Sequence, residues 1–262
     1  MMVVEARDLV KSYRGGDNST ITVLNGVNLQ VARGEMVAIT GASGAGKSTL
    51  LHMLGALDRP TRGHVLLSGI AVTAIAGTGI ATPARKNVFG RMVAKRRQRE
   101  DERIRDDELS DIRNRTVGFV FQFHHLLREF SALENVMMPL RIAGWETRKA
   151  RSRAEELLSR VGLSGRMEHR PSELSGGEQQ RTAVARALAI DPAILLADEP
   201  SGNLDKMNSE LLHDLFAELA KDLEIAMVVV THNPSLAARA HRALLLESGR
   251  LRDTNVHEVV GS

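Results

Sequence analysis

Short apolar runs alternate along the chain with longer stretches in which apolar residues recur at helical spacing. The short runs are rich in aliphatic and β-branched residues and predict strands, three of them almost continuously apolar. The predicted strands are Met36–Thr40, Val117–Phe121, Ile194–Ala197 and Ile225–Val230. The predicted helices are Lys47–Leu57, Arg148–Val161, Gly177–Ala189 and Met207–Leu223. Because continuously apolar strands are typical of a sheet that helices cover on both faces, we expect an α/β fold with a mainly parallel core sheet.

Two segments depart from this alternation. Val3–Val31 predicts antiparallel strands joined by a turn at Arg14–Asn18, where two glycines stand together. Thr82–Ser110 is dominated by charge, with a basic stripe at Lys95–Arg99 followed by two groups of acids. Because it has few apolar residues to anchor it, this segment is either a solvated loop or an exposed charged helix.

Composition narrows the classes of function. The 262 residues are 43% hydrophobic and 26% charged, and the net charge of +3 is too mild to favour nucleic acid as a partner. The chain has no cysteine, which excludes disulfides and thiolate chemistry. No apolar run approaches the roughly 20 residues of a membrane span, and the acids near Met1 do not fit a signal peptide. We therefore expect a soluble protein that contacts a membrane mainly through partners.

A glycine-rich loop lies between the predicted strand Met36–Thr40 and the helix that Lys47 opens. It fits the pattern G-x-x-x-x-G-K-[ST] with Gly41, Ala42, Ser43, Gly44, Ala45, Gly46, Lys47, Ser48 and Thr49. Glycines allow backbone N–H groups to surround a phosphate, and the helix N-terminus adds partial positive charge. Lys47 would reach the β- and γ-phosphates, and the Ser48 hydroxyl would bind Mg²⁺. The alternative is an ordinary glycine turn, which the strand–loop–helix context disfavours.

Two adjacent acids, Asp198 and Glu199, follow the apolar strand Ile194–Ala197. Acids at the end of a buried strand are costly unless something cationic lies there, and ligands of open α/β sheets bind beyond the carboxyl ends of the strands. Asp198 would therefore face Mg²⁺, and Glu199 would polarise the attacking water. The alternative is an acidic turn that caps a helix before Pro200, which the phosphate loop in the same chain disfavours.

A second possible anion cradle starts the predicted helix near residue 177. Ser175, Gly176 and Gly177 precede Glu178, so backbone N–H groups again meet a helix N-terminus. Taken alone, the pattern is better explained as a plain helix N-cap. One chain with two cradles and one lysine-bearing loop, however, suggests a nucleotide touched by two surfaces.

The order and spacing of these features resemble ABC-transporter nucleotide-binding domains over nearly the whole chain. The residues that carry the resemblance are Tyr13, Gly41–Thr49, Gln122, Leu174–Glu178, Asp198, Glu199, Asp205 and His232. The resemblance implies a P-loop NTPase of ABC type, a single ABC ATPase domain over residues 1–262, with an N-terminal antiparallel β subdomain and a helical signature subdomain. It divides the chain into a β and P-loop core at residues 1–75 and 190–262, a charged insertion at 77–110, and a signature subdomain at 125–185.

The resemblance also implies roles for single residues in an ATP-hydrolysing enzyme. Two copies would face head to tail and sandwich two ATP molecules. Glu199 would be the catalytic base, with His232 and Lys47 at the γ-phosphate. Tyr13 would stack on adenine, although a surface turn is its alternative role, and Asp205 would lie at the interface between the copies. A structural hydrogen bond is the alternative role for His232.

The remaining implied roles concern the second copy and the metal. Ser175, Gly176, Gly177 and Glu178 would approach the γ-phosphate held by the other copy. Ser48, Gln122 and Asp198 would hold Mg²⁺, and Gln122 would also make the coupling contact to a membrane partner.

Within the family, Phe121–Leu127 and Phe130–Val136 resemble the lipoprotein-releasing branch. That branch implies a homodimer beneath two integral membrane permease subunits, peripheral on the cytoplasmic face of the bacterial inner membrane, that releases lipoproteins for sorting to the outer membrane. Macrolide or peptide exporters and cell-division ATPases are the alternatives within the family. Soluble ABC ATPases of DNA repair or translation are a further alternative, which the lack of sustained heptads and of a second domain disfavours.

Three features depart from the family pattern. Asn233 stands where aspartate is frequent, Ser201 stands where threonine is usual, and Thr82–Ser110 is an insertion. The basic stripe of the insertion could meet anionic lipid headgroups, with a solvated loop as the alternative. His124 and His125 could be exposed loop residues without a special role.

Overall fold

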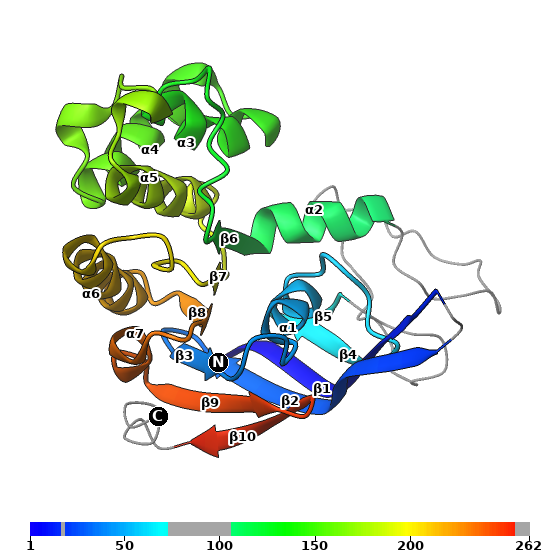
Figure 1. Cartoon of the computed structure of the whole chain (residues 1–262). Helices are drawn as coiled ribbons and strands as arrows, with labels where there is room; N and C mark the ends of the chain where they lie inside the picture. Colours follow the sequence, from blue (N-terminus) through cyan, green and yellow to red (C-terminus); the bar gives the residue numbers. More distant parts are fainter. Residues whose placement is uncertain (17–18, 73–105, 255–262) are drawn as a thin grey trace, which may run out of the picture.

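The core of the molecule is a six-stranded sheet in a computed structural model that describes residues 1–16, 19–72 and 106–254. The strands follow the order β10-β9-β3-β8-β7-β6, and all neighbours are parallel except β10 and β9 (Figure 1). They are β3 (Met36–Thr40), β6 (Val117–Phe121), β7 (Ile194–Asp198), β8 (Ala226–Val230), β9 (Arg242–Glu247) and β10 (Arg250–Thr254). The predicted α/β fold with a mainly parallel sheet is thus confirmed.

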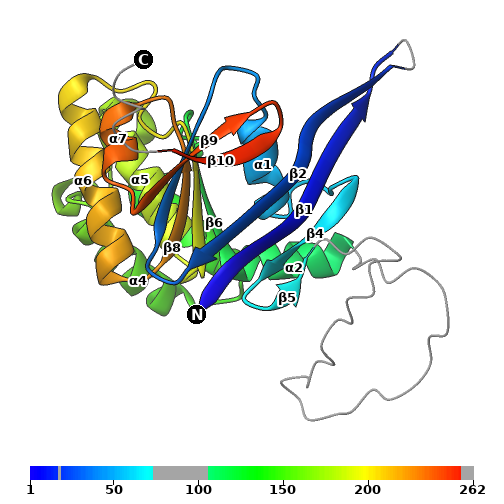
Figure 2. The same ribbon diagram turned by 90° about the horizontal axis from the view of Figure 1, so that it is seen from below.

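A second, antiparallel sheet lies at the N-terminal side and has the order β2-β1-β4-β5. Its strands are β1 (Met2–Arg14), β2 (Thr20–Ala32), β4 (Arg62–Leu67) and β5 (Ile70–Ala71). Strands β1 and β2 form a long hairpin, seen in Figure 2 as a ribbon beside β4. The antiparallel pair predicted from Val3–Val31 is therefore confirmed.

Alternate side chains of the core strands enter two separate apolar clusters. In β7, Leu195 and Ala197 join the cluster formed with the helices α3 to α6, whereas Ile194 and Leu196 join the cluster that includes α1 and the antiparallel sheet. Each central strand is thus covered on both faces, which explains its continuous apolar sequence. The helices are α1 (Lys47–Leu54), α2 (Asp106–Thr116), α3 (Ala132–Ile142), α4 (Thr147–Arg160), α5 (Gly176–Leu188), α6 (Lys206–Asp222) and α7 (Pro234–Ala238), with 3-10 turns η1 (Ser164–Arg166) and η2 (Pro171–Glu173).

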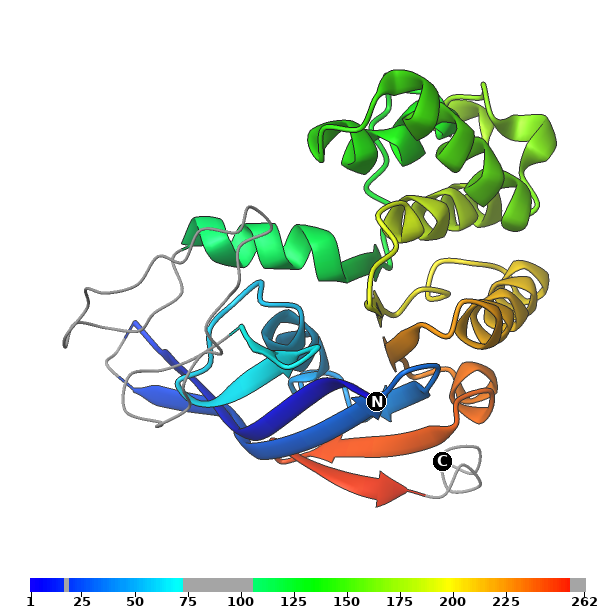
Figure 3. The same ribbon diagram turned by 180° about the vertical axis from the view of Figure 1, so that it is seen from behind.

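Helices α3, α4 and α5 pack on one another and form a helical lobe beyond the edge strand β6 (Figures 1 and 3). The phosphate-loop helix α1 lies apart from this lobe, between the two sheets. In the described part of the chain, no helix has the length and apolar content that crossing a bilayer requires.

The predicted elements match the structure except near their ends. Helix α1 ends at Leu54 rather than Leu57, and at Gly55 a Cβ would lie 2.0 Å from the Phe119 ring. Most of the charged segment Thr82–Ser110 lies outside the described residues, as does the basic stripe Lys95–Arg99. Its last part belongs to α2, where Leu109 is buried against the core, so this end is neither a loop nor a fully exposed helix.

Candidate functional site

The glycine-rich loop connects the end of β3 to the start of α1. Gly41, Gly44 and Gly46 have positive φ angles of 145°, 77° and 101°. A Cβ at Gly41 would lie 2.4 Å from the Leu246 carbonyl oxygen, and one at Gly46 would lie 2.7 Å from Val23 Cγ1. Both the backbone conformation and the lack of space therefore require glycine at these two positions.

Lys47 folds back over this loop. Its Nζ donates to the carbonyl oxygens of Gly41 and Ala42, at 2.8 and 3.0 Å. The first turn of α1 contains no acidic residue, and its leading N–H groups have no partners within the helix. An ammonium group and a helix N-terminus at one loop form a binding place for an anion such as a phosphate.

Asp198 is the last residue of β7, and its Oδ1 is buried without a hydrogen-bond partner among the described residues. A buried carboxylate oxygen without a donor is costly, and a cation beside it would remove that cost. Strand β8 separates β7 from β3, so the acid lies about 10 Å from the phosphate-loop strand. The free carboxylate oxygen of Asp198 is thus a ligand of the kind that Mg²⁺ prefers. Among the described residues, no three or more His, Asp and Glu side chains form a cluster that could hold a metal ion by themselves.

Glu199 and His232 meet at the carboxyl ends of β7 and β8. Glu199 has a positive φ of 44°, a conformation that a residue with a Cβ rarely adopts. Its Oε2 accepts from the His232 backbone N–H at 3.2 Å and lies 2.9 Å from the imidazole Nδ1. The His232 side chain is 74% exposed while that of Glu199 is 18% exposed, so the imidazole can reach a ligand that the carboxylate faces.

Gln122 follows β6 and contacts Asn203, a partner that the sequence did not predict. Its Nε2 donates to Asn203 Oδ1 at 3.0 Å, and Asn203 Nδ2 donates to the Gln122 carbonyl oxygen at 3.3 Å. The amide that was expected to bind Mg²⁺ is thus held by the segment after Glu199. Asn203 could have been found from its place between Glu199 and Asp205, but no spacing rule pairs it with Gln122.

Ser175 to Glu178 begin helix α5 in the helical lobe. Ser175 and Glu178 form a capping box, in which Ser175 N–H donates to Glu178 Oε2 at 2.8 Å and Glu178 N–H donates to Ser175 Oγ at 3.3 Å. The backbone N–H of Ser175 is the main reason that the pKa of Glu178 is lowered, and Arg166 adds to it. No hydrogen bond or ion pair between described residues joins this helix start to the phosphate loop, and the two lie in different lobes in Figures 1 and 3.

Tyr13 and Asp205 both have partners within the chain. Tyr13 donates its hydroxyl to Asp58 Oδ2 at 3.2 Å, and Lys11 Nζ lies 4.8 Å from the ring centroid. Asp205 is the N-cap of α6 and accepts from Asn208 N–H at 2.8 Å, a bond that lowers the pKa of its carboxyl. Their expected contacts with adenine and with a second copy remain predictions.

Two of the three departures from the family pattern, Asn233 and Ser201, fit the local structure. Asn233 caps α7 by accepting from Ser235 N–H and Leu236 N–H. Ser201 Oγ lies 2.9 Å from Nε2 of the buried His213. Each substituted side chain therefore has a hydrogen-bonding role.

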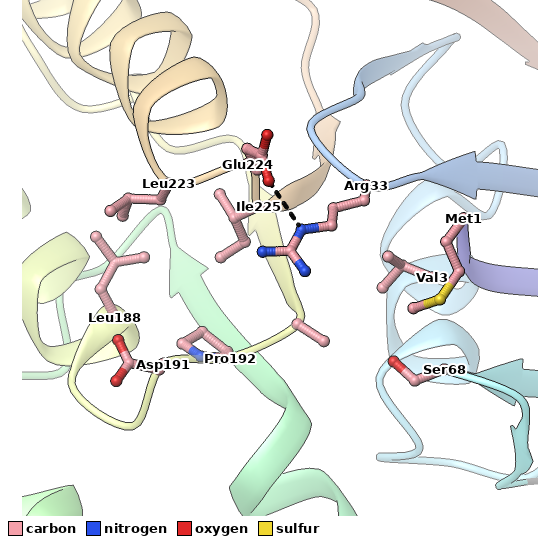
Figure 4. A pocket seen from close by; sticks show the side chains of 11 residues that line it. Met1, Val3, Arg33, Ser68, Leu188, Asp191, Pro192, Leu223, Glu224 and Ile225 are labelled. Atoms are coloured by element: carbon pink, nitrogen blue, oxygen red, sulfur yellow. Dashed lines mark ion pairs between the residues drawn. The ribbon is translucent and has the colours of Figure 1, made fainter.

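A cavity of about 420 Å³ opens at the amino ends of the core strands, where β7 and β8 begin (Figure 4). Apolar side chains such as Leu223 and Ile225 line it, and Arg33 pairs with Glu224 at its rim at 3.3 Å. Both charged side chains are more than half exposed, so this ion pair contributes little. The phosphate loop and the acids after β7 lie at the opposite ends of these strands, so this cavity is not part of their site.

Comparison with known proteins places these features in a family. A model described as ABC transporter matches residues 24–202. The chain is 47% identical over 249 residues to the "Lipoprotein-releasing system ATP-binding protein LolD" of Geobacter metallireducens, covering 95% of this chain and 97% of that protein. A protein of the same description from Shewanella sp. (strain MR-4) is 46% identical, covering 98% of both. The fold is similar to that of the dimeric ATP-binding cassette MJ0796 in a post-hydrolysis state bound to ADP and Pi, with a TM-score of 0.78, 35% identity and coverage of 97% and 98%.

Proposed function

Because the chain belongs to the ABC transporter family and is an ATPase of that family, we propose that its ATP hydrolysis powers the release of lipoproteins from the bacterial inner membrane for sorting to the outer membrane. The observation that carries the ATPase chemistry is the meeting of three features at the carboxyl ends of β3, β8 and β7. They are the phosphate loop, the Glu199–His232 pair, and the buried Asp198 oxygen that has no hydrogen-bond partner among the described residues. The cargo rests on the identity of 46–47% with LolD proteins over almost the whole chain.

ATP would bind through its phosphates at Gly41–Thr49. The loop N–H groups and Lys47 Nζ would surround the β- and γ-phosphates, and the ammonium would exchange its two carbonyl acceptors for phosphate oxygens. Tyr13, which is 42% exposed, would contact the adenine. The exposed Ser48 hydroxyl, Asp198 Oδ1 and the Gln122 amide oxygen would hold Mg²⁺, and Gln122 Nε2 can keep its hydrogen bond to Asn203 while its oxygen does so.

Bound Mg²⁺ would neutralise negative charge on the phosphate oxygens. Glu199 would accept the proton of the attacking water, for which its partly buried carboxylate is suitably placed at the end of β7. His232 would hold that carboxylate through its backbone N–H and turn its exposed imidazole toward the γ-phosphate. Together these side chains would orient the reacting groups and balance their charge, which is the main requirement of phosphoryl transfer.

A second copy of the chain would complete each ATP site. Ser175, Gly176, Gly177 and Glu178 lie in a lobe away from the chain's own phosphate loop, so they would approach the ATP of the other copy. Asp205 would lie at the same interface, because the start of α6 packs beside the start of α5. A Cβ at Gly177 would fall 2.3 Å from Asn208 Oδ1. The dimeric state of the similar cassette MJ0796 supports this arrangement.

A groove between β6, α2 and α3 would receive the membrane permease subunits. It has a volume of about 630 Å³ and is lined by apolar side chains that include Phe119, Met138 and Ile142. Among its lining side chains, Ile142 is 73% exposed and Leu127 is 43% exposed. Large apolar side chains exposed together are typical of a protein–protein contact. Two permease subunits would hold the homodimer on the cytoplasmic face of the inner membrane.

The test is purification of the tagged chain from detergent-solubilised bacterial membranes, followed by reconstitution of the complex in vesicles that contain a fluorescent lipoprotein. We expect two permease subunits to co-purify and ATP to drive the lipoprotein out of the vesicles. A Lys47→Ala complex serves as the control and should assemble without releasing it. ATPase activity without lipoprotein release, in a complex that instead exports a macrolide or a peptide, would refute the proposed cargo.

A further inference from the structure

The segment that carries Gln122 is fastened to helix α5 by side-chain hydrogen bonds. This Gln122 segment (Phe121–His125) accepts from Gln180 Nε2 at the Phe121 carbonyl, at 3.0 Å. Arg186 donates to the carbonyl oxygens of His124 and His125 at 2.9 and 2.6 Å. Gln180 lies about one turn and Arg186 nearly three turns after the start of the helix at Gly176.

One further bond reaches the first turn of the helix. His124 Nε2 lies 3.0 Å from the carbonyl oxygen of Gly176, which is the second residue of the cradle Ser175–Glu178. A carbonyl can only accept, so Nε2 must carry the proton.

The Gln122 segment also contacts the residues that follow Glu199 at the carboxyl end of β7. Gln122 exchanges two hydrogen bonds with Asn203, four residues after Glu199. A Cβ at Gly202 would lie 3.0 Å from Gln122 Nε2, so the two segments are in close contact. A displacement at the chain's own ATP site would therefore reach His124 through two peptide units.

We propose that His124 is a positioning residue that fixes the first turn of α5 relative to Gln122 and thereby couples the chain's own ATP site to the site that it completes on a second copy. The inference rests on the proposed two-copy function. If Gln122 moved at the chain's own ATP, the Gly176 carbonyl would move with it. The N–H groups next to Gly176 would then meet the ATP of the second copy at a different position. Two sites that share one hydrogen-bonded element bias each other through it.

Two substitutions of His124 distinguish the effect of its hydrogen bond to Gly176 from the effect of the packing of its ring. His124→Phe keeps a planar ring and removes the donor, whereas His124→Gln supplies an amide N–H that can reach Gly176. His125→Asn is the matched control, because His125 is the exposed neighbour and its φ of 47° is a conformation that asparagine tolerates. Each variant is made in a Glu199→Gln chain, and the measurement is ATP-dependent dimerisation by size-exclusion chromatography with light scattering.

We expect His124→Phe to raise the ATP concentration for half-maximal dimerisation by about 3- to 10-fold, the effect of one lost hydrogen bond. His124→Gln and His125→Asn should remain within about 2-fold of the parent, with affinity of the monomer for ATP unchanged in all variants. In chains with Glu199 intact, His124→Phe should also lower the Hill coefficient of ATP hydrolysis toward 1, which a loss of stability alone would not do.

Two results would count against the inference in different ways. Equal dimerisation and an equal Hill coefficient in His124→Phe and its parent would overturn the role of His124 and leave the proposed function intact. Failure of the Glu199→Gln parent itself to dimerise with ATP would overturn the two-copy site and the inference together.

Discussion

At the scale of single residues, the site depends on side chains whose partners are incomplete within one chain. Asp198 has a buried oxygen to which no described residue donates, and Glu199 is held in a costly backbone conformation beside His232. Such features persist only when the surrounding structure enforces them and are frequent at functional sites. Their chemical roles can be tested by substitutions that keep their shape.

Glu199→Gln is expected to bind ATP and to lose at least about 100-fold in turnover, because the amide cannot accept the proton of the attacking water. Steady-state phosphate release and equilibrium binding of a fluorescent ATP analogue measure the two effects. Glu218→Gln, at an exposed position about three turns along α6, is the control and should retain turnover. Normal turnover in Glu199→Gln would remove the base from the proposed mechanism.

His213 should make stability depend on pH. It is fully buried and bonded to Ser201, and burial lowers its pKa, with Arg239 acting in the same direction and Glu210 and Asp214 opposing. In the unfolded chain His213 therefore binds a proton as the pH falls through about 6.5, whereas in the folded chain it binds one only at lower pH. The stabilisation is complete above that pH and is lost as the pH falls below it, toward the lower pKa of the folded state.

Urea unfolding of the wild type and of His213→Gln at pH 8 and pH 5.5 measures this contribution. The glutamine can still bond Ser201 but does not titrate, so the wild type should lose more of its free energy of unfolding than the variant. Equal losses would show that His213 does not carry the effect. His64, whose pKa is also lowered by burial, is unchanged in both chains and cancels in the comparison.

At the scale of elements, continuous apolar runs were reliable predictors and sparse ones were not. The strands β3 and β6 begin and end where their apolar runs do, because both faces are buried. Helix α3 was not predicted, since Pro139 lies inside it and usually ends a helix. For the start of α2, the sequence left a solvated loop and an exposed charged helix open, because charge dominates it. Among the α2 side chains that the structure describes, Leu109 and Ile112, one turn apart, are buried.

Leu109→Ala should lower the free energy of unfolding by about 2–4 kcal/mol, because a side chain that is 5% exposed leaves a cavity against the core. Asp111→Ala, on the exposed side of the same helix, should change it by less than about 0.5 kcal/mol. Chemical denaturation of both variants is the measurement. A negligible effect of Leu109→Ala would mean that α2 does not contribute to the core.

At the scale of the whole molecule, the separation of the helical lobe from the phosphate loop supports the proposal that one chain is half of a catalytic unit. The chain supplies the loop and Glu199 on the core sheet and the Ser175–Glu178 cradle on the lobe. A head-to-tail pair related by two-fold symmetry would complete two equal sites. ATP would then act as a ligand that joins two copies as well as a substrate.

We therefore expect ATP to convert Glu199→Gln from monomer to dimer, and Ser175→Arg to prevent this without weakening ATP binding by the monomer. The arginine would place bulk at the surface that faces the second copy, where Ser175 is exposed. Light scattering with and without ATP gives the mass of each species. An ATP-bound Ser175→Arg dimer would place the interface elsewhere.

The sequence by itself determined the strand–loop–helix of the phosphate site, the acids after β7 and the cap of α5, because each depends on neighbours within a few residues. Spacing and backbone preferences are local properties, and they are readable without the fold. Only the tertiary structure decided that Gln122 bonds Asn203, that His124 bonds Gly176 and that Asp198 keeps an unpartnered oxygen. These contacts join residues 50 or more positions apart or depend on burial, so the local sequence does not specify them.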